Sequence, residues 1–176
     1  TLGFGDDTSS DGKLTINTNV REGQFEGRTD IREVVIKEGV TEIGNNAFER
    51  CTGLTLLTLP AGLRIIGDRA FARCTGLTSV TLPTGLQTIH IGTFCRCTGL
   101  ASVTLPAGLQ TIGQDAFFTC TSLASLTFPA GLTRIEKGAF FGCSSLASVT
   151  FGDALQTIEY GAFKGCSSLA SVVFPD

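Results

Sequence analysis

Cysteine is the residue type whose number and spacing first suggest chemistry in this sequence. The 176-residue chain contains seven cysteines, and six of them share a spacing of 23 residues: Cys51, Cys74, Cys97, Cys120, Cys143 and Cys166. If repeats of this length stack as parallel coils, neighbouring thiols lie about 4.8 Å apart with parallel Cβ vectors, which suits a ladder of buried thiols better than disulfides. We therefore expect inert thiols that pack as small hydrophobic side chains. Cys95 lies outside this spacing, and we expect it at an outward position.

Two other combinations of residues could carry chemistry near Cys97. His90 with Cys95 and Cys97 could bind a metal, but Cys97 belongs to the repeated set and a fourth ligand is absent from the pattern. A nucleophilic pair of Cys95 and His90 has no orienting acid in the sequence around it. We expect His90 to be a surface residue, and we expect neither a metal nor a cofactor nor enzyme activity.

The segment from Asp7 to Gly12 has the spacing that begins a calcium-binding loop. Oxygen-bearing side chains occupy its first, third and fifth positions and glycine the sixth. The twelfth position is Thr18, where such a loop needs a bidentate glutamate. A hairpin turn explains the same residues, so a calcium site and a turn both remain open.

The 23-residue spacing extends to phenylalanine and leucine, which indicates that the whole chain is a repeat. Phe48 and Leu54 each recur six times at this interval. A fixed period of this length predicts a solenoid of stacked supersecondary units that share one continuous core. β-branched and aromatic residues predict one short parallel strand in each coil: residues 34–36, 57–59, 80–82, 103–105, 126–128, 149–151 and 172–174.

The turns between these strands have their own signals. Pro-x-Gly segments such as residues 106–108 end the strands, because proline lacks an N–H and glycine tolerates positive φ. The x-Ala-Phe-x-x-Cys run then predicts a single helical or 3-10 turn on the outer side of each coil. We expect the threonine or serine after each repeated cysteine to bond to nearby backbone groups: Thr52, Thr75, Thr98, Thr121, Ser144 and Ser167.

The two ends depart from the repeat. Residues 1–24 are expected to form an N-terminal cap, with a tight turn at Asp11-Gly12 and a half-buried strand over 13–20, and residues 25–176 one continuous solenoid. The chain starts at Thr1 and lacks methionine, so we expect a processed product or a fragment. It ends directly after a strand, which leaves Val172, Val173 and Phe174 without a polar cap. Either further chain belongs there, or the open end stacks head to tail on another copy and forms filaments.

The consensus L-x-x-V-x-L-P-x-x-L-x-x-I-x-x-x-A-F-x-x-C-x-x-L resembles the BspA-like, or Treponema pallidum type, leucine-rich repeats over about residues 25–176. This resemblance implies a leucine-rich-repeat solenoid with a curved parallel β-sheet. It also implies an extracellular or cell-surface protein that adheres to proteins or other cells, without catalytic residues or cofactor.

The strand positions between buried residues predict the binding face, because the sheet of a solenoid is its extended recognition surface. These positions carry short hydroxyl side chains that suit a protein or a glycan: Thr58, Ser79, Thr81, Ser102, Thr104, Ser125, Thr127, Ser148 and Thr150. Two alternatives remain open. The hydroxyls could simply be what a solvated strand tolerates, or the regular lattice could order water in the way that ice-binding solenoids do.

Charge and hydropathy exclude two classes of partner. The net charge is −3 and no basic stripe is visible, so nucleic acid is not expected. No apolar run approaches the ~20 residues that span a bilayer, so membrane insertion is not expected.

Overall fold

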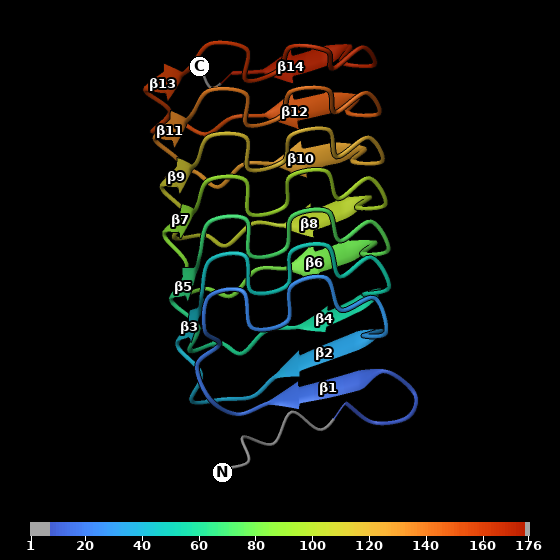
Figure 1. The fold of residues 1–176 in the computed structure, drawn as a ribbon. Coiled ribbons are helices and arrows are strands. Elements are labelled where there is room, and N and C mark those ends of the chain that lie inside the picture. Colours follow the sequence, from blue (N-terminus) through green and yellow to red (C-terminus); the bar gives the residue numbers. More distant parts are fainter. Residues whose placement is uncertain (1–7, 175–176) are drawn as a thin grey trace.

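The protein is an elongated stack of coils, and the computed structural model describes its residues 8–174 (Figure 1). The longer strands lie side by side along the stack: β1 (Lys13–Ile16), β2 (Glu33–Ile36), β4 (Leu56–Thr58), β6 (Ser79–Thr81), β8 (Ser102–Thr104), β10 (Ser125–Thr127), β12 (Ser148–Thr150) and β14 (Ser171–Val173). A second series of two-residue strands follows them in the coils: β3 (Glu42–Ile43), β5 (Ile65–Ile66), β7 (Thr88–Ile89), β9 (Thr111–Ile112), β11 (Arg134–Ile135) and β13 (Thr157–Ile158). All pairings between these strands are parallel.

The seven predicted strands are present, but most lie one residue nearer the N-terminus than predicted. The strand expected over residues 80–82, for example, is Ser79–Thr81. The Leu82 amide still donates to the carbonyl of Thr104 at 3.0 Å. Pro83 follows and has no N–H to continue the ladder, which explains the earlier end.

β1 adds an eighth strand, because its alternating sequence fits the same sheet. Leu14 and Ile16 are buried, and β1 pairs in parallel with β2 over its whole length. The expected strand over 13–20 is thus shorter than predicted. The tight turn before it is confirmed: the Gly12 amide donates to the Ser9 carbonyl at 2.9 Å, and Gly12 has φ +82°. The division into a cap of residues 1–24 and a solenoid of 25–176 stays a prediction.

The hydrogen-bonded ladders are interrupted along the stack. The longer strands form the sheets β1-β2-β4, β6-β8 and β10-β12-β14, and the short strands form β3-β5 and β7-β9-β11-β13. The register nevertheless repeats, so Ser79 lies opposite Ser102 and Thr81 opposite Thr104.

The outer side of each coil is a run of turns in which successive N–H groups point in different directions. The Phe117 amide donates to the Ala139 carbonyl of the next coil at 2.7 Å, whereas the Cys120 amide donates back to the Phe117 carbonyl at 3.1 Å. The backward bond is the i to i+3 bond expected of a 3-10 turn. Because alternate amides bind the neighbouring coil, the run stays a series of turns and does not extend into a helix.

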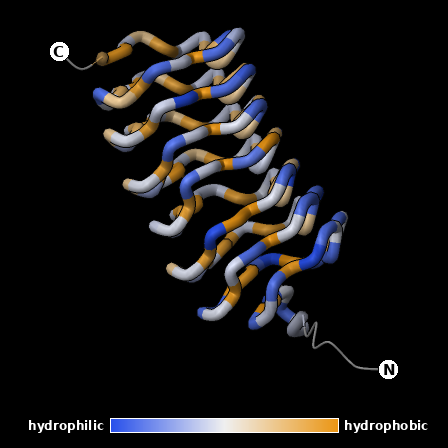
Figure 2. Tube along the Cα trace, turned by 90° about the vertical axis from the view of Figure 1, so that its left-hand side faces the viewer, coloured by the Kyte–Doolittle hydropathy of each residue, from blue (hydrophilic) through white to orange (hydrophobic). Residues whose placement is uncertain are grey.

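Phenylalanine rings fill the centre of the stack. One ring from each coil stacks on the next, with adjacent centroids 5.1 to 5.7 Å apart. Each fully buried ring stabilises the fold by roughly 1.5–3 kcal/mol through the hydrophobic effect. Hydrophilic and hydrophobic segments alternate in the same way from coil to coil (Figure 2).

The turns require left-handed backbone at two positions in most coils. Glycine occupies several of these positions, but other residues adopt φ between 52° and 63°: Asn46, Arg50, Arg69, Arg73, Arg96, Asp115 and Thr119. A left-handed conformation costs an L-residue roughly 1–2 kcal/mol. The equivalent of Thr119 in the next coil is Gly142, with φ 72°.

Exchanging the residues at these equivalent positions should shift stability in opposite directions. We expect Thr119→Gly to raise the free energy of unfolding by about 0.5–1 kcal/mol, since the relief of strain exceeds the entropy that glycine gains in the unfolded chain. Gly142→Thr should lower it by about 1–2 kcal/mol, because its Cβ would lie 3.0 Å from the Thr119 methyl group. Urea unfolding followed by circular dichroism measures the free energy of unfolding of both variants. A Thr119→Gly variant that is less stable than the wild type would contradict the left-handed backbone at residue 119.

Candidate functional site

The predicted binding face is an open lattice of hydroxyl groups on the longer strands. Val80 is buried between Ser79 and Thr81, which are both exposed, and β10 repeats this arrangement, whereas the central residues of β4 and β8 are half-buried. Of the nine predicted residues, only Ser148 is half-buried. Between residues 8 and 174, none of the nine hydroxyls forms an intramolecular side-chain hydrogen bond. Their hydrogen-bonding capacity is therefore free for water or a ligand.

Three of these residues also line a shallow hollow. It has a volume of about 460 Å³ and lies between β4 and β6, with Thr58, Ser79 and Thr81 in its wall. The hydrogen-bonded ladder is interrupted between these same two strands. The remaining six predicted residues lie on the open lattice outside this hollow.

The sheet face extends further toward the N-terminus than the sequence analysis placed it. Thr15 of β1 is in register with Val35, which in turn is in register with Thr58. Lys13 and Glu33 form an ion pair at 3.0 Å in the neighbouring column. Apolar and polar residues alternate over 13–16, and this pattern predicted a strand. The strand was nevertheless predicted to be part of a cap, not of the sheet face.

The repeated cysteines form the expected ladder. Each thiol donates to the carbonyl oxygen of a phenylalanine in the preceding coil at 3.1 to 3.2 Å, as Cys97 does to Phe71. All seven thiols are free. Burial raises the pKa of Cys51 to about 11 and the pKa values of Cys97 and Cys143 to about 12. Thiols that stay protonated are poor nucleophiles and poor metal ligands.

The metal and calcium candidates gain no support from the geometry. Within residues 8–174, no three His, Cys, Asp or Glu side chains are grouped so that they could hold a metal ion. Cys95 is half-buried, and burial raises its pKa. Asp7 lies outside the described residues, while the Asp11 carboxylate accepts hydrogen bonds from the Ser9 hydroxyl and the Lys13 amide. These bonds close the hairpin turn.

The hydroxyls after the repeated cysteines do not have the predicted role. Of the six, only Thr121 donates to a nearby backbone carbonyl, that of Thr98 at 3.5 Å. The neighbouring Ser122 makes the shorter bond to the same oxygen, at 2.6 Å. In this coil the second hydroxyl of the turn, not the first, makes the closer contact with the preceding coil.

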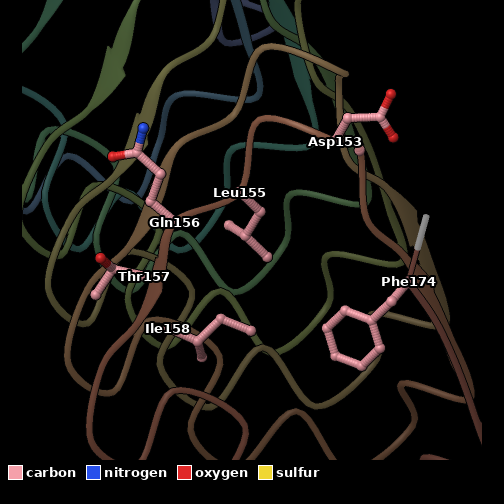
Figure 3. Close-up of a pocket in the computed structure, with 7 residues that line it drawn as sticks. Asp153, Leu155, Gln156, Thr157, Ile158 and Phe174 are labelled. Atoms are coloured by element: carbon pink, nitrogen blue, oxygen red, sulfur yellow. The ribbon is translucent and has the colours of Figure 1, made fainter. Parts of the chain in front are cut away.

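The last described coil presents an apolar surface. Val172, Val173 and Phe174 are 45%, 49% and 60% exposed. Phe174 also stacks on Phe151 at 5.2 Å. A hollow of about 420 Å³ lies beside it, and Leu155, Ile158 and Phe174 point toward one another across it (Figure 3).

The parallel coils, the phenylalanine stack and the flat sheet face define a leucine-rich-repeat solenoid. The family model described as the BspA type leucine rich repeat region matches in six copies over residues 18–143 and 92–176. The chain therefore belongs to this family. Its members typically mediate recognition or adhesion at surfaces, leucine-rich-repeat proteins generally bind other proteins, and the solenoids are generally non-catalytic.

Solved structures share this architecture. The T. pallidum leucine-rich repeat protein TpLRR has 31% sequence identity and a TM-score of 0.84, and the match covers 92% of this chain and 79% of that one. A Bacteroides ovatus leucine-rich repeat protein has 25% identity and a TM-score of 0.64, with 90% of this chain and 52% of that one covered. The chain thus spans about half the length of the B. ovatus protein. No curated protein sequence matches the chain. Residues 8–174 contain no helix long and apolar enough to cross a membrane.

The thiol ladder should make stability fall at alkaline pH. The folded pKa of Cys97, about 12, is raised above its ordinary value of 9.0, so the unfolded chain loses the proton first. The stabilisation is complete below pH 9 and is lost as pH rises from there toward 12, with a slope of up to about 1.4 kcal/mol per pH unit for each thiol. Urea unfolding between pH 8 and 10.5 should give a shallower slope for Cys97→Ala than for the wild type. Cys95→Ala is the control with a smaller effect, and equal slopes in all three proteins would contradict a buried Cys97 thiol.

Proposed function

We propose that this protein is a non-catalytic recognition or adhesion module that binds a protein or a glycan through the hydroxyl face of its longer strands. The observation that carries the proposal is the set of nine serine and threonine hydroxyls that have no intramolecular side-chain partner. A polar group that satisfies its hydrogen bonds only with solvent can exchange water for a ligand at little cost. The regular register offers such groups at about 4.8 Å intervals along the stack.

The chemistry of the face favours a flat, polar partner. The predicted positions carry no charge and no aromatic side chain, so the face lacks the Arg, Tyr and Trp anchors of tight protein interfaces. Sugar hydroxyls and extended peptide backbone are partners that short hydroxyl side chains can bind. The hollow between β4 and β6 gives a ligand on this face a recess lined by Thr58, Ser79 and Thr81.

We also propose an extracellular or cell-surface location. Recognition and adhesion at surfaces are typical of the BspA type family.

Charged replacements on the face test the proposal. Thr81→Arg, Thr104→Arg and Thr127→Arg together should abolish binding to the neutral glycans of a glycan array and to a panel of immobilised extracellular proteins. The fold should persist, because these side chains point to solvent. A matched control is Gln87→Arg, Gln110→Arg and Gln156→Arg, which adds the same charge at exposed positions outside the face. Binding that survives in the first variant, or is lost equally in the second, would contradict the proposal.

A second candidate function is self-assembly through the last coil. The exposure of Val172, Val173 and Phe174 favours it, since solenoids bury such surface against another unit. Light scattering should then give a mass that rises with concentration, and Phe174→Lys should lower that mass. A wild-type protein that remains monomeric across the concentration range would contradict this candidate.

A further inference from the structure

A second surface lies on the outer side of the coils, at the corner that leads back to the longer strands. Arg50, Arg73 and Arg96 occupy equivalent positions in three consecutive coils, each directly before a repeated cysteine. Each arginine amide donates to a carbonyl of the following coil at 2.7 or 2.8 Å. This short row of three arginines was not among the features predicted from the sequence. We call these three residues the arginine column.

The backbone of the arginine column is strained. The three residues have φ between 60° and 63°. The equivalent position is Thr119 in the next coil and glycine in three others, Gly27, Gly142 and Gly165, which adopt positive φ without steric cost. Arginine at such a position costs stability, and strained backbone of this kind clusters at functional sites. The glycines also identify a substitution that the fold accepts.

A groove of about 560 Å³ runs along the arginine column. Thr52, Thr75 and Thr98 line it beside the three arginines. These threonines are held close to the column, because the amide of Thr75 donates to the carbonyl of Arg73 at 2.9 Å and Thr52 repeats the bond with Arg50. The groove thus combines guanidinium groups with hydroxyl donors.

Within residues 8–174, no ion pair involves an arginine of the column. The ion pairs there are formed by other residues, such as Arg28 with Asp30 and Arg69 with Glu49. Arg73 Nε is buried and has no hydrogen-bond partner, and among residues 8–174 no other buried side-chain nitrogen or oxygen is left in this state. A buried N–H donor without an acceptor costs stability.

We propose that the arginine column binds an acidic glycan whose carboxylate or sulfate groups recur along the chain. Guanidinium groups match such anions with paired hydrogen bonds. The arginines recur once per coil, at about 4.8 Å, and a sugar residue advances a glycan by a similar length. Side chains on one face of an extended peptide recur at about 6.6 Å, so they do not match the spacing of the arginines. A single-stranded nucleic acid needs aromatic stacking surfaces, and the groove lining has none.

The test is fluorescence anisotropy with a labelled heparin hexasaccharide at low ionic strength and at about 0.15 M salt. Wild-type protein should bind, with an affinity that falls as salt rises. The variant R50G/R73G/R96G should bind about tenfold or more weakly, and should be folded because glycine suits positive φ. The charge control is K37S/R64S/K137S, which removes three exposed positive charges outside the groove and should change the affinity by less than about twofold.

A second variant separates paired hydrogen bonding from charge alone, and further probes separate an acidic glycan from other ligands. R50K/R73K/R96K keeps the charge but loses the paired hydrogen bonds, so it should bind several-fold more weakly than the wild type. If the glycine variant fails to fold, this lysine variant still tests the proposal. A maltohexaose, a hexaglutamate peptide and an oligothymidylate should each bind more weakly than the heparin hexasaccharide. Absent binding of that hexasaccharide, an equal loss in the charge control, or tighter binding of the peptide or the oligonucleotide would overturn the proposal.

Discussion

The structure depends on the contact that each coil makes with the one before it at the buried phenylalanine and cysteine. The ring of Phe94 stacks on that of Phe71 with centroids 5.7 Å apart, and the Cys97 thiol of the same coil donates to the carbonyl of Phe71. The phenylalanine amide meanwhile donates forward to the following coil. Ring contacts and two hydrogen bonds in opposite directions thus connect each coil from Phe48 to Phe140 to both neighbours, and this constrains the interior to the same residues in each repeat.

That constraint leaves the surface free to vary, and different parts of it carry different chemistry. The sheet face repeats short hydroxyls from β6 to β12. The outer corner carries arginine in three coils and threonine or glycine in the others. Because solenoid coils contact only their neighbours, such differences accumulate along the stack without disturbing the core. A single chain can therefore present chemically distinct surfaces around one interior.

Much of this arrangement could be predicted from the sequence, because the 23-residue spacing fixes which residues share a column. The buried thiols, the phenylalanine core and the exposed hydroxyls of residues such as Thr104 followed from spacing and alternation. The exact strand limits did not, since they depend on where a proline such as Pro83 removes an N–H from the ladder. The interruptions of the sheet are a property of the three-dimensional stacking, which no repeat consensus specifies.

The arginine column was missed for a related reason. Its residues are 23 apart, but three arginines among seven coils are a weak signal next to six cysteines. Their grouping became clear only when the turn geometry placed them at one corner with left-handed backbone. The threonines beside them were assigned a backbone-capping role, because a repeat period gives the column of a side chain and not its direction at a turn.

Native-state hydrogen exchange measured residue by residue tests the central claim most directly, namely that coil-to-coil contacts at the phenylalanine column hold the fold together. We expect the amides of Phe94 and Phe117, which donate to the next coil at 2.8 and 2.7 Å, to exchange only through global unfolding. If these amides exchange as fast as those of the exposed turns, the contacts between coils at the phenylalanine column do not hold the fold together.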